Sequence, residues 1–139
     1  MIQRRIINYL FTKIFHLLYK KRFKNLGENS RIIFPLDIQG MRNIHIGDGV
    51  RIGYKTWLAC AANNPARQSQ LIIGEGTCVG NFNHIYCTSH IEIGKKVLTA
   101  DKVYISDNLH SYEDVNVPII DQPVKQINPV HIGDGSWIG

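Results

Sequence analysis

The sequence is poor in cysteine, and none of its cysteines belongs to a Cys-x-x-Cys pair. Cys60, Cys78 and Cys87 form an odd set, which argues against a disulfide framework and against a cysteine-rich zinc site. A reducing compartment, the cytoplasm, therefore fits best. We expect the three thiols to serve as small buried hydrophobic groups.

The first 25 residues lack acidic side chains, although they hold seven of the sixteen lysines and arginines. The remainder of the chain carries nine basic and eleven acidic residues. Since the positive charge belongs to one segment, the sequence gives no basic surface across the whole chain. We therefore expect no nucleic-acid partner.

A hydrophobic run long enough to cross a bilayer is also missing. Residues 2–18 instead place apolar side chains at helical spacing, interrupted by Asn8, Lys13 and His16. We predict a basic amphipathic helix over residues 1–25. Two locations for it stay open. One is a membrane interface, where apolar burial and attraction to anionic lipid add. The other is the surface of its own β-domain or of a neighbouring subunit.

One short phrase, aliphatic-x-aliphatic-Gly, is abundant in the sequence. It occurs at residues 44–47, 71–74, 91–94 and 130–133. Such internal repetition is typical of a solenoid. Aliphatic residues also recur at steps of six, and one such series is Ile73, Val79, Ile85 and Ile91. Period six fits neither an amphipathic helix nor a two-faced strand. It predicts a triangular solenoid with three short strands per turn, each sending one aliphatic side chain inward.

The spacing of the repeats predicts two inserted loops. The repeat glycines are Gly47, Gly74, Gly94 and Gly133, separated by 27, 20 and 39 residues. A gap of 20 is one turn of the solenoid, so the longer gaps hold extra chain near residues 59–70 and 106–129. Loops that project from a rigid scaffold often carry function.

Four features of the repeat region resemble the hexapeptide-repeat acyltransferases, and most nearly the galactoside, maltose and polysaccharide O-acetyltransferases. Asn81-Phe82-Asn83 follows a repeat, as a similar motif does in that family. His110 lies sixteen residues after Gly94, the spacing of the family's catalytic histidine. Trp137-Ile138-Gly139 is similar to a coil beside the family's coenzyme A channel, and the run from Ser106 to Val124 resembles its active-site loop.

The resemblance implies an all-β fold: a left-handed parallel β-helix of hexapeptide repeats over residues 26–139, with an N-terminal α-helix, assembled as a homotrimer. It implies transfer of acetyl from acetyl-CoA to a hydroxyl of a sugar or polysaccharide precursor, without a metal. The family's pattern continues for several coils after Trp-Ile-Gly, whereas this sequence ends at Gly139, and we expect a β-helix truncated in mid-coil. The alternative is therefore a non-catalytic or truncated scaffold that lacks the coenzyme A site.

His110 is the candidate general base, because an alcohol must lose its proton as it attacks a thioester and a histidine can accept that proton. Without the resemblance, a surface loop histidine is the favoured interpretation. Asp107, Glu113 or Asp114 could orient its ring through the second nitrogen, and nothing in the sequence chooses among them.

The resemblance also implies roles for four further residues. Asn83 would bind the acceptor or the tetrahedral oxyanion, although a turn asparagine that satisfies backbone groups is the alternative. Asp107 and Tyr112, beside the histidine, are candidate substrate-binding residues. Trp137 would flank the coenzyme, and its alternative is packing against a neighbouring subunit.

Histidine positions raise a third hypothesis, zinc-dependent hydration at a trimer interface. His84 and His90 are six residues apart, so they occupy equivalent positions on neighbouring faces and cannot converge within one chain. We expect His45 and His131, each between two repeat aliphatics, to be surface residues.

Overall fold

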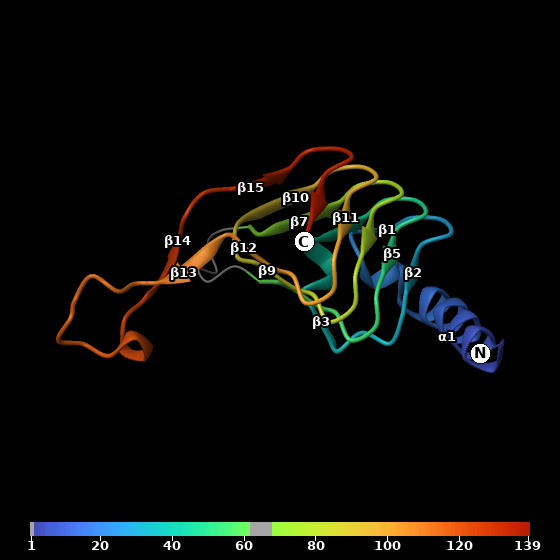
Figure 1. Cartoon of the computed structure of the whole chain (residues 1–139), viewed down its shortest axis with the longest axis horizontal. Coiled ribbons are helices and arrows are strands. Elements are labelled where there is room, and N and C mark those ends of the chain that lie inside the picture. The colour runs from blue at the N-terminus through green and yellow to red at the C-terminus, as the bar shows by residue number, and fades with distance from the viewer. Residues whose placement is uncertain (1, 62–67) are drawn as a thin grey trace.

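The computed structural model describes residues 2–61 and 68–139. The N-terminal helix α1 spans Ile2–Tyr19, and the short 3-10 helix η1 spans Lys20–Arg22. Apart from one antiparallel pair, the strands that follow form three parallel sheets around one axis, along which the turns of the chain stack, with α1 at one end (Figure 1). The hand of the winding, expected to be left, stays a prediction.

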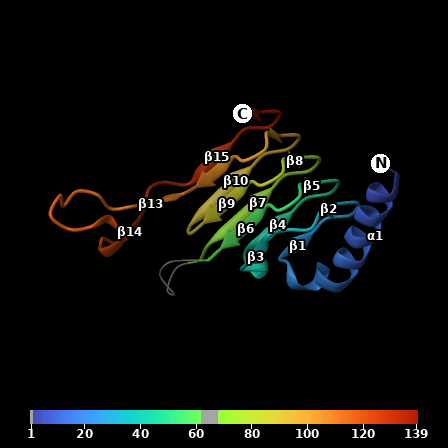
Figure 2. The same ribbon diagram turned by 60° about the horizontal axis from the view of Figure 1, so that its bottom comes forward.

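Successive strands along the chain belong to the three sheets in rotation, as the six-residue period predicts. The first sheet holds β1 (Asn25–Leu26), β4 (Ile44–Ile46), β7 (Gln70–Ile73), β10 (His90–Ile93) and β15 (Val130–Ile132). The second sheet holds β2 (Arg31–Ile32), β5 (Arg51–Ile52), β8 (Cys78–Val79), β11 (Leu98–Thr99) and β16 (Trp137–Ile138). The third sheet holds β3 (Asp37–Gln39), β6 (Trp57–Cys60), β9 (His84–Cys87) and β12 (Tyr104–Ser106). This topology is compatible with a β-helix, and Figure 2 shows the strands of successive turns side by side.

The strand register fixes the length of a turn. Ile91 on β10 pairs with Leu71 on β7, 20 residues earlier. Leu71 pairs with Ile44, and Ile91 also pairs with Val130 across the largest gap. The two longer gaps therefore contain insertions. In the first, predicted near residues 59–70, residues 62–67 lie outside the described part of the chain. The second insertion contains the 3-10 helix η3 (Ile119–Asp121). Elsewhere in the chain, the 3-10 helix η2 (Met41–Asn43) precedes β4.

The predicted inward aliphatics form the core. Those at the six-residue steps have exposed fractions of 0–7%, except Ile38, which is half-buried. The offset corner position often holds a hydroxyl residue, and there it links two turns. The Thr77 hydroxyl donates to the Gly94 carbonyl oxygen at 2.7 Å and accepts a hydrogen bond from the Val97 N–H at 3.0 Å. A threonine at this corner satisfies backbone groups that an aliphatic side chain would leave unpaired.

Three of the four repeat glycines, Gly47, Gly74 and Gly94, are required by close contact between turns. A Cβ added to Gly74 would lie 2.5 Å from the carbonyl carbon of Gly94, and one added to Gly47 would lie 2.7 Å from the Glu75 nitrogen. Backbones stacked this closely leave no room for a side chain.

Helix α1 contacts the first turn through aromatic residues. The apolar stripe predicted from the sequence did not separate these from the aliphatic residues of the helix. Phe15 is 9% exposed, and the Phe11 ring stacks on Phe34 at 3.8 Å. The remaining aliphatics of the predicted stripe lie outside this contact with exposed fractions of 52–82%: Ile6, Ile7, Leu10, Ile14, Leu17 and Leu18. In residues 2–61 and 68–139, no helix has the length and hydropathy of a membrane span.

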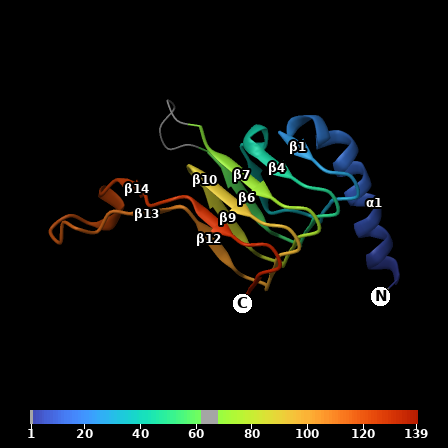
Figure 3. The ribbon, with the colours of Figure 1, turned by 90° about the horizontal axis from the view of Figure 1, so that it is seen from above.

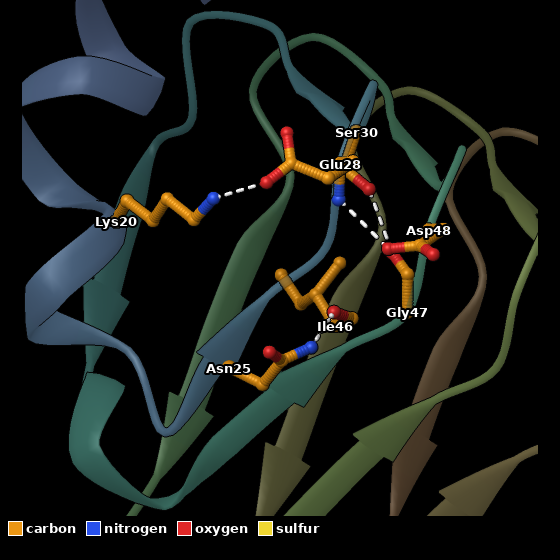
Figure 4. A network of polar contacts seen from close by, with 7 residues as sticks. All are labelled: Lys20, Asn25, Glu28, Ser30, Ile46, Gly47 and Asp48. Carbon is orange, nitrogen blue, oxygen red and sulfur yellow. Dashed lines mark hydrogen bonds and ion pairs between the residues drawn. The ribbon is translucent and has the colours of Figure 1, made fainter.

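A polar network joins the end of the helix to the first corner (Figure 4). Lys20 forms an ion pair with Glu28, and the Glu28 N–H donates to the Asp48 carboxylate at 2.7 Å. At the same corner, the Ser30 hydroxyl donates to the Gly47 carbonyl oxygen at 2.6 Å. The network fixes the end of the helix against the first turn of the stack.

Candidate active site

The second insertion forms a hairpin that projects from the stack (Figures 1 and 3). Its strands are β13 (Asn108–His110) and β14 (Val124–Gln126), which pair antiparallel with His110 opposite Val124. Residues 112–121, between the strands, are all exposed. The hairpin therefore presents both polar and apolar side chains to solvent, with Val115 and Ile120 exposed by 92% and 85%.

Asp107 anchors the start of this hairpin. Its carboxylate is 1% exposed and accepts hydrogen bonds from the backbone N–H groups of Thr88, Ser89 and His90 at 2.6–2.8 Å. Burial by itself would raise the pKa of Asp107, but these backbone donors and the Asn108 amide outweigh it and hold that pKa below its ordinary value. The buried carboxylate is thus an ionised brace between the insertion and the turn before β10.

His110 lies exposed at the end of β13, three residues after this brace. Among the described residues, no hydrogen bond to its ring is found. The neighbouring Ser111 N–H donates to the Pro123 carbonyl oxygen at 2.9 Å, which closes the strand pair behind the histidine. The ring is held on a fixed backbone and stays open to a substrate.

The three acidic residues considered as orienting groups are engaged elsewhere. Asp107 binds the turn before β10, Glu113 pairs with Lys125 across the hairpin, and Asp114 accepts from the Asn116 N–H at 2.9 Å. The Lys125 ammonium lowers the pKa of Glu113 through its hydrogen bond. In the described part of the chain, none of the three contacts His110.

Asn83 is 1% exposed, and its amide is fully used within the stack. The Nδ2 group donates to the carbonyl oxygens of Ala100 at 2.8 Å and Asn81 at 3.2 Å, while Oδ1 accepts from the Thr99 hydroxyl at 3.0 Å. This is the turn-asparagine geometry that the sequence left open. Its role toward a substrate stays a prediction.

Trp137 and Tyr112 are both largely exposed, at 74% and 65%. Trp137 lies on β16 opposite Leu98 of β11, on the outer face of the second sheet. Tyr112 follows His110 on the hairpin. Among the described residues, no hydrogen bond or ring contact joins His110 to Asn83 or Trp137.

The thiols and His84 lie partly or fully buried in the stack. Cys60 and Cys87 are fully buried as predicted, whereas Cys78 is half-buried. His84 stacks on Trp57 with ring centroids 4.1 Å apart, and burial lowers its pKa. It lies on β9 and His90 on β10, in different sheets, as the six-residue step predicts.

The sequence reasoning missed a cluster of two histidines and a glutamate. His90, Glu92 and His131 offer ligand atoms that all lie within 4.8 Å of one another on the outer face of the first sheet. The repeat pattern gives His131 as an outward-facing residue. Its neighbours could be identified only from the pairing of β10 with β15, which joins the two sides of the 39-residue gap.

Comparisons with known proteins give one relative. No protein-family model matches the chain, and no solved structure matches it. A curated protein of Mycobacterium tuberculosis, named as a probable acetyltransferase, is 36% identical over 99 residues. The alignment covers 71% of this chain and 31% of that protein. The chain thus spans about a third of the length of the relative that it matches.

Proposed function

We propose that this chain is the acceptor-side part of an O-acetyltransferase built on a left-handed parallel β-helix. It transfers acetyl from acetyl-CoA to a hydroxyl of a sugar or polysaccharide precursor. The observation that carries the proposal is the exposed His110 on a hairpin braced by the buried Asp107 carboxylate. The similarity to a protein named as a probable acetyltransferase supports it.

The chemistry asked of His110 is a single proton transfer. The acceptor oxygen attacks the thioester carbon while its proton passes to the imidazole, and the leaving coenzyme thiolate then takes up that proton, which restores the neutral histidine. The thioester is already activated, so base catalysis worth roughly 10²–10⁴ in rate is the main help the protein must supply at the oxygen. The His110 ring has no hydrogen bond to another described side chain, so it is free to accept a proton from that hydroxyl.

A homotrimer would complete the site. The projecting hairpin extends well beyond its own stack (Figure 3), and closed symmetry lets such an arm reach a neighbouring subunit. Trp137 on that neighbour would then flank the coenzyme arm. The competing function, a scaffold without a coenzyme A site, is favoured by the absence of contacts between His110 and Trp137 among the described residues.

Removal of the histidine tests the proposal in the full natural gene product. His110→Ala and His110→Asn should lower kcat for acetyl transfer to saccharides by roughly 10²-fold or more, because neither side chain accepts the proton. His45→Ala, on the outer face of the first sheet, is the matched histidine control and should retain activity. Near wild-type transfer by both His110 variants would exclude the general-base assignment.

The exposed helix stripe supports a second proposal, peripheral contact with an anionic membrane surface on the cytoplasmic side. The side of α1 away from the stack carries apolar residues, and no acidic residue occurs before Glu28. Arg5 on the helix and Arg31 and Arg51 on the second sheet line a groove of about 350 Å³ beside it. Anionic headgroups would balance these arginines while acyl chains cover the stripe.

A further inference from the structure

The cluster of His90, Glu92 and His131 is built by the strand register of the first sheet. Glu92 on β10 pairs with His131 on β15, so their side chains leave the sheet side by side. His90 lies two positions before Glu92 and therefore on the same outer face. The His131 Nδ1 and Glu92 Oε2 atoms are 3.3 Å apart, and the His90 Nε2 atom lies 3.9 Å from the same oxygen.

These three groups have the chemistry of a transition-metal site. Two imidazole nitrogens and one carboxylate oxygen are ligands for Zn²⁺ and its first-row neighbours. Ligand atoms on a tetrahedral zinc ion stand about 3.3 Å apart, given bonds of about 2.0–2.1 Å. The His131–Glu92 distance already has this value, and the partly exposed side chains need only small rotations to bring in His90. We propose that His90, Glu92 and His131 bind one divalent transition-metal ion, with water in the remaining position.

The position of the cluster gives such a site a structural consequence. The backbone N–H of His90 donates to the Asp107 carboxylate at 2.8 Å, at the start of the inserted hairpin. The His90 side chain meets His131, on the strand where the chain returns after the hairpin. Both ends of the insertion therefore converge on His90. A bound metal would fasten the returning strand β15 to β10 and close the base of the hairpin.

Zinc titration of the metal-free protein tests the proposal, with a chromogenic chelator as competitor. We expect one Zn²⁺ per wild-type chain, and affinity reduced at least about tenfold in His90→Ala, Glu92→Gln and His131→Ala. His45→Ala is the matched control, because His45 lies on the same outer face two strands from β10, and it should bind zinc as the wild type does. Wild-type affinity in His131→Ala, or no stoichiometric binding by the wild type, would overturn the site.

Two further readouts separate a metal site from nonspecific zinc adsorption. Co²⁺ bound by three protein ligands and water should give intense visible absorption bands in the wild type and not in Glu92→Gln. Zn²⁺ should raise the Tm of the wild type, because the ion binds only the folded register, and should leave that of Glu92→Gln unchanged. Glu92→Gln keeps the size of a half-exposed side chain, so circular dichroism should show an intact fold. An equal zinc-induced Tm rise in wild type and Glu92→Gln would also contradict the proposal.

Discussion

Asp107 is an almost fully buried carboxylate at the base of the inserted hairpin. Its buried carboxylate satisfies three consecutive backbone donors before β10 and so fixes the strand that carries His110. From the sequence it was a candidate substrate-binding or orienting residue. Its low exposure and its hydrogen bonds show that the carboxylate braces the backbone, and its role toward a substrate stays a prediction.

Asp107→Asn should lower the free energy of unfolding by about 2–3 kcal/mol near neutral pH, since an amide group would face buried N–H donors. The folded pKa of Asp107 lies below its ordinary value of 3.8. Its stabilising contribution is therefore complete above that value and is lost as the pH falls through the folded pKa. Urea unfolding at about pH 6 and about pH 3 checks both statements.

The matched control is Asp121→Asn, an exposed carboxylate of the same loop, which should change stability by less than about 0.5 kcal/mol. The difference between wild type and Asp107→Asn should shrink as the pH drops below 3.8. A difference independent of pH would mean that the amide, rather than the lost charge, causes the effect.

At the scale of the element, the strands were predictable because each strand of each turn needs one aliphatic side chain that points inward. Ile73, Val79 and Ile85 point inward at steps of six, and the structure buries all three completely. The insertions follow no such period. Neither the β13–β14 pairing nor the contact of His131 with Glu92 could be predicted, because both depend on where the chain returns after a loop that the repeat does not constrain.

Gly74→Ala tests the stacking of these elements. The new Cβ would lie 2.5 Å from the Gly94 backbone, so two turns must separate, at a cost of about 1–3 kcal/mol. Gly133→Ala is the matched control, since the nearest atom to its Cβ is 3.8 Å away, and its stability should stay within about 0.5 kcal/mol of wild type. Equal midpoints in thermal and urea unfolding for the two variants would contradict the close-contact explanation.

At the scale of the whole molecule, α1 is apolar on two sides, and one stack cannot cover both. Phe11 and Phe15 face the first turn, while Ile14 and Leu17 face outward with exposed fractions of 57% and 82%. The sequence stripe combined these two sets, because helical spacing alone does not tell which apolar residues pack on the stack. An outward stripe beside basic residues fits an anionic bilayer, and a second copy of the chain is the competing occupant.

Vesicle co-sedimentation decides between them. Wild-type protein should bind vesicles that contain phosphatidylglycerol, bind phosphatidylcholine vesicles weakly, and lose binding as salt screens the basic residues. Ile14→Glu should lower the partition at least about tenfold, because burial of an isoleucine contributes about 1.5–3 kcal/mol. Val115→Glu, on the exposed hairpin loop, should bind as the wild type does. Sedimentation without lipid should give a trimer for all three proteins. If Ile14→Glu instead changes this mass and leaves vesicle binding intact, the stripe holds copies of the chain together and the membrane proposal fails.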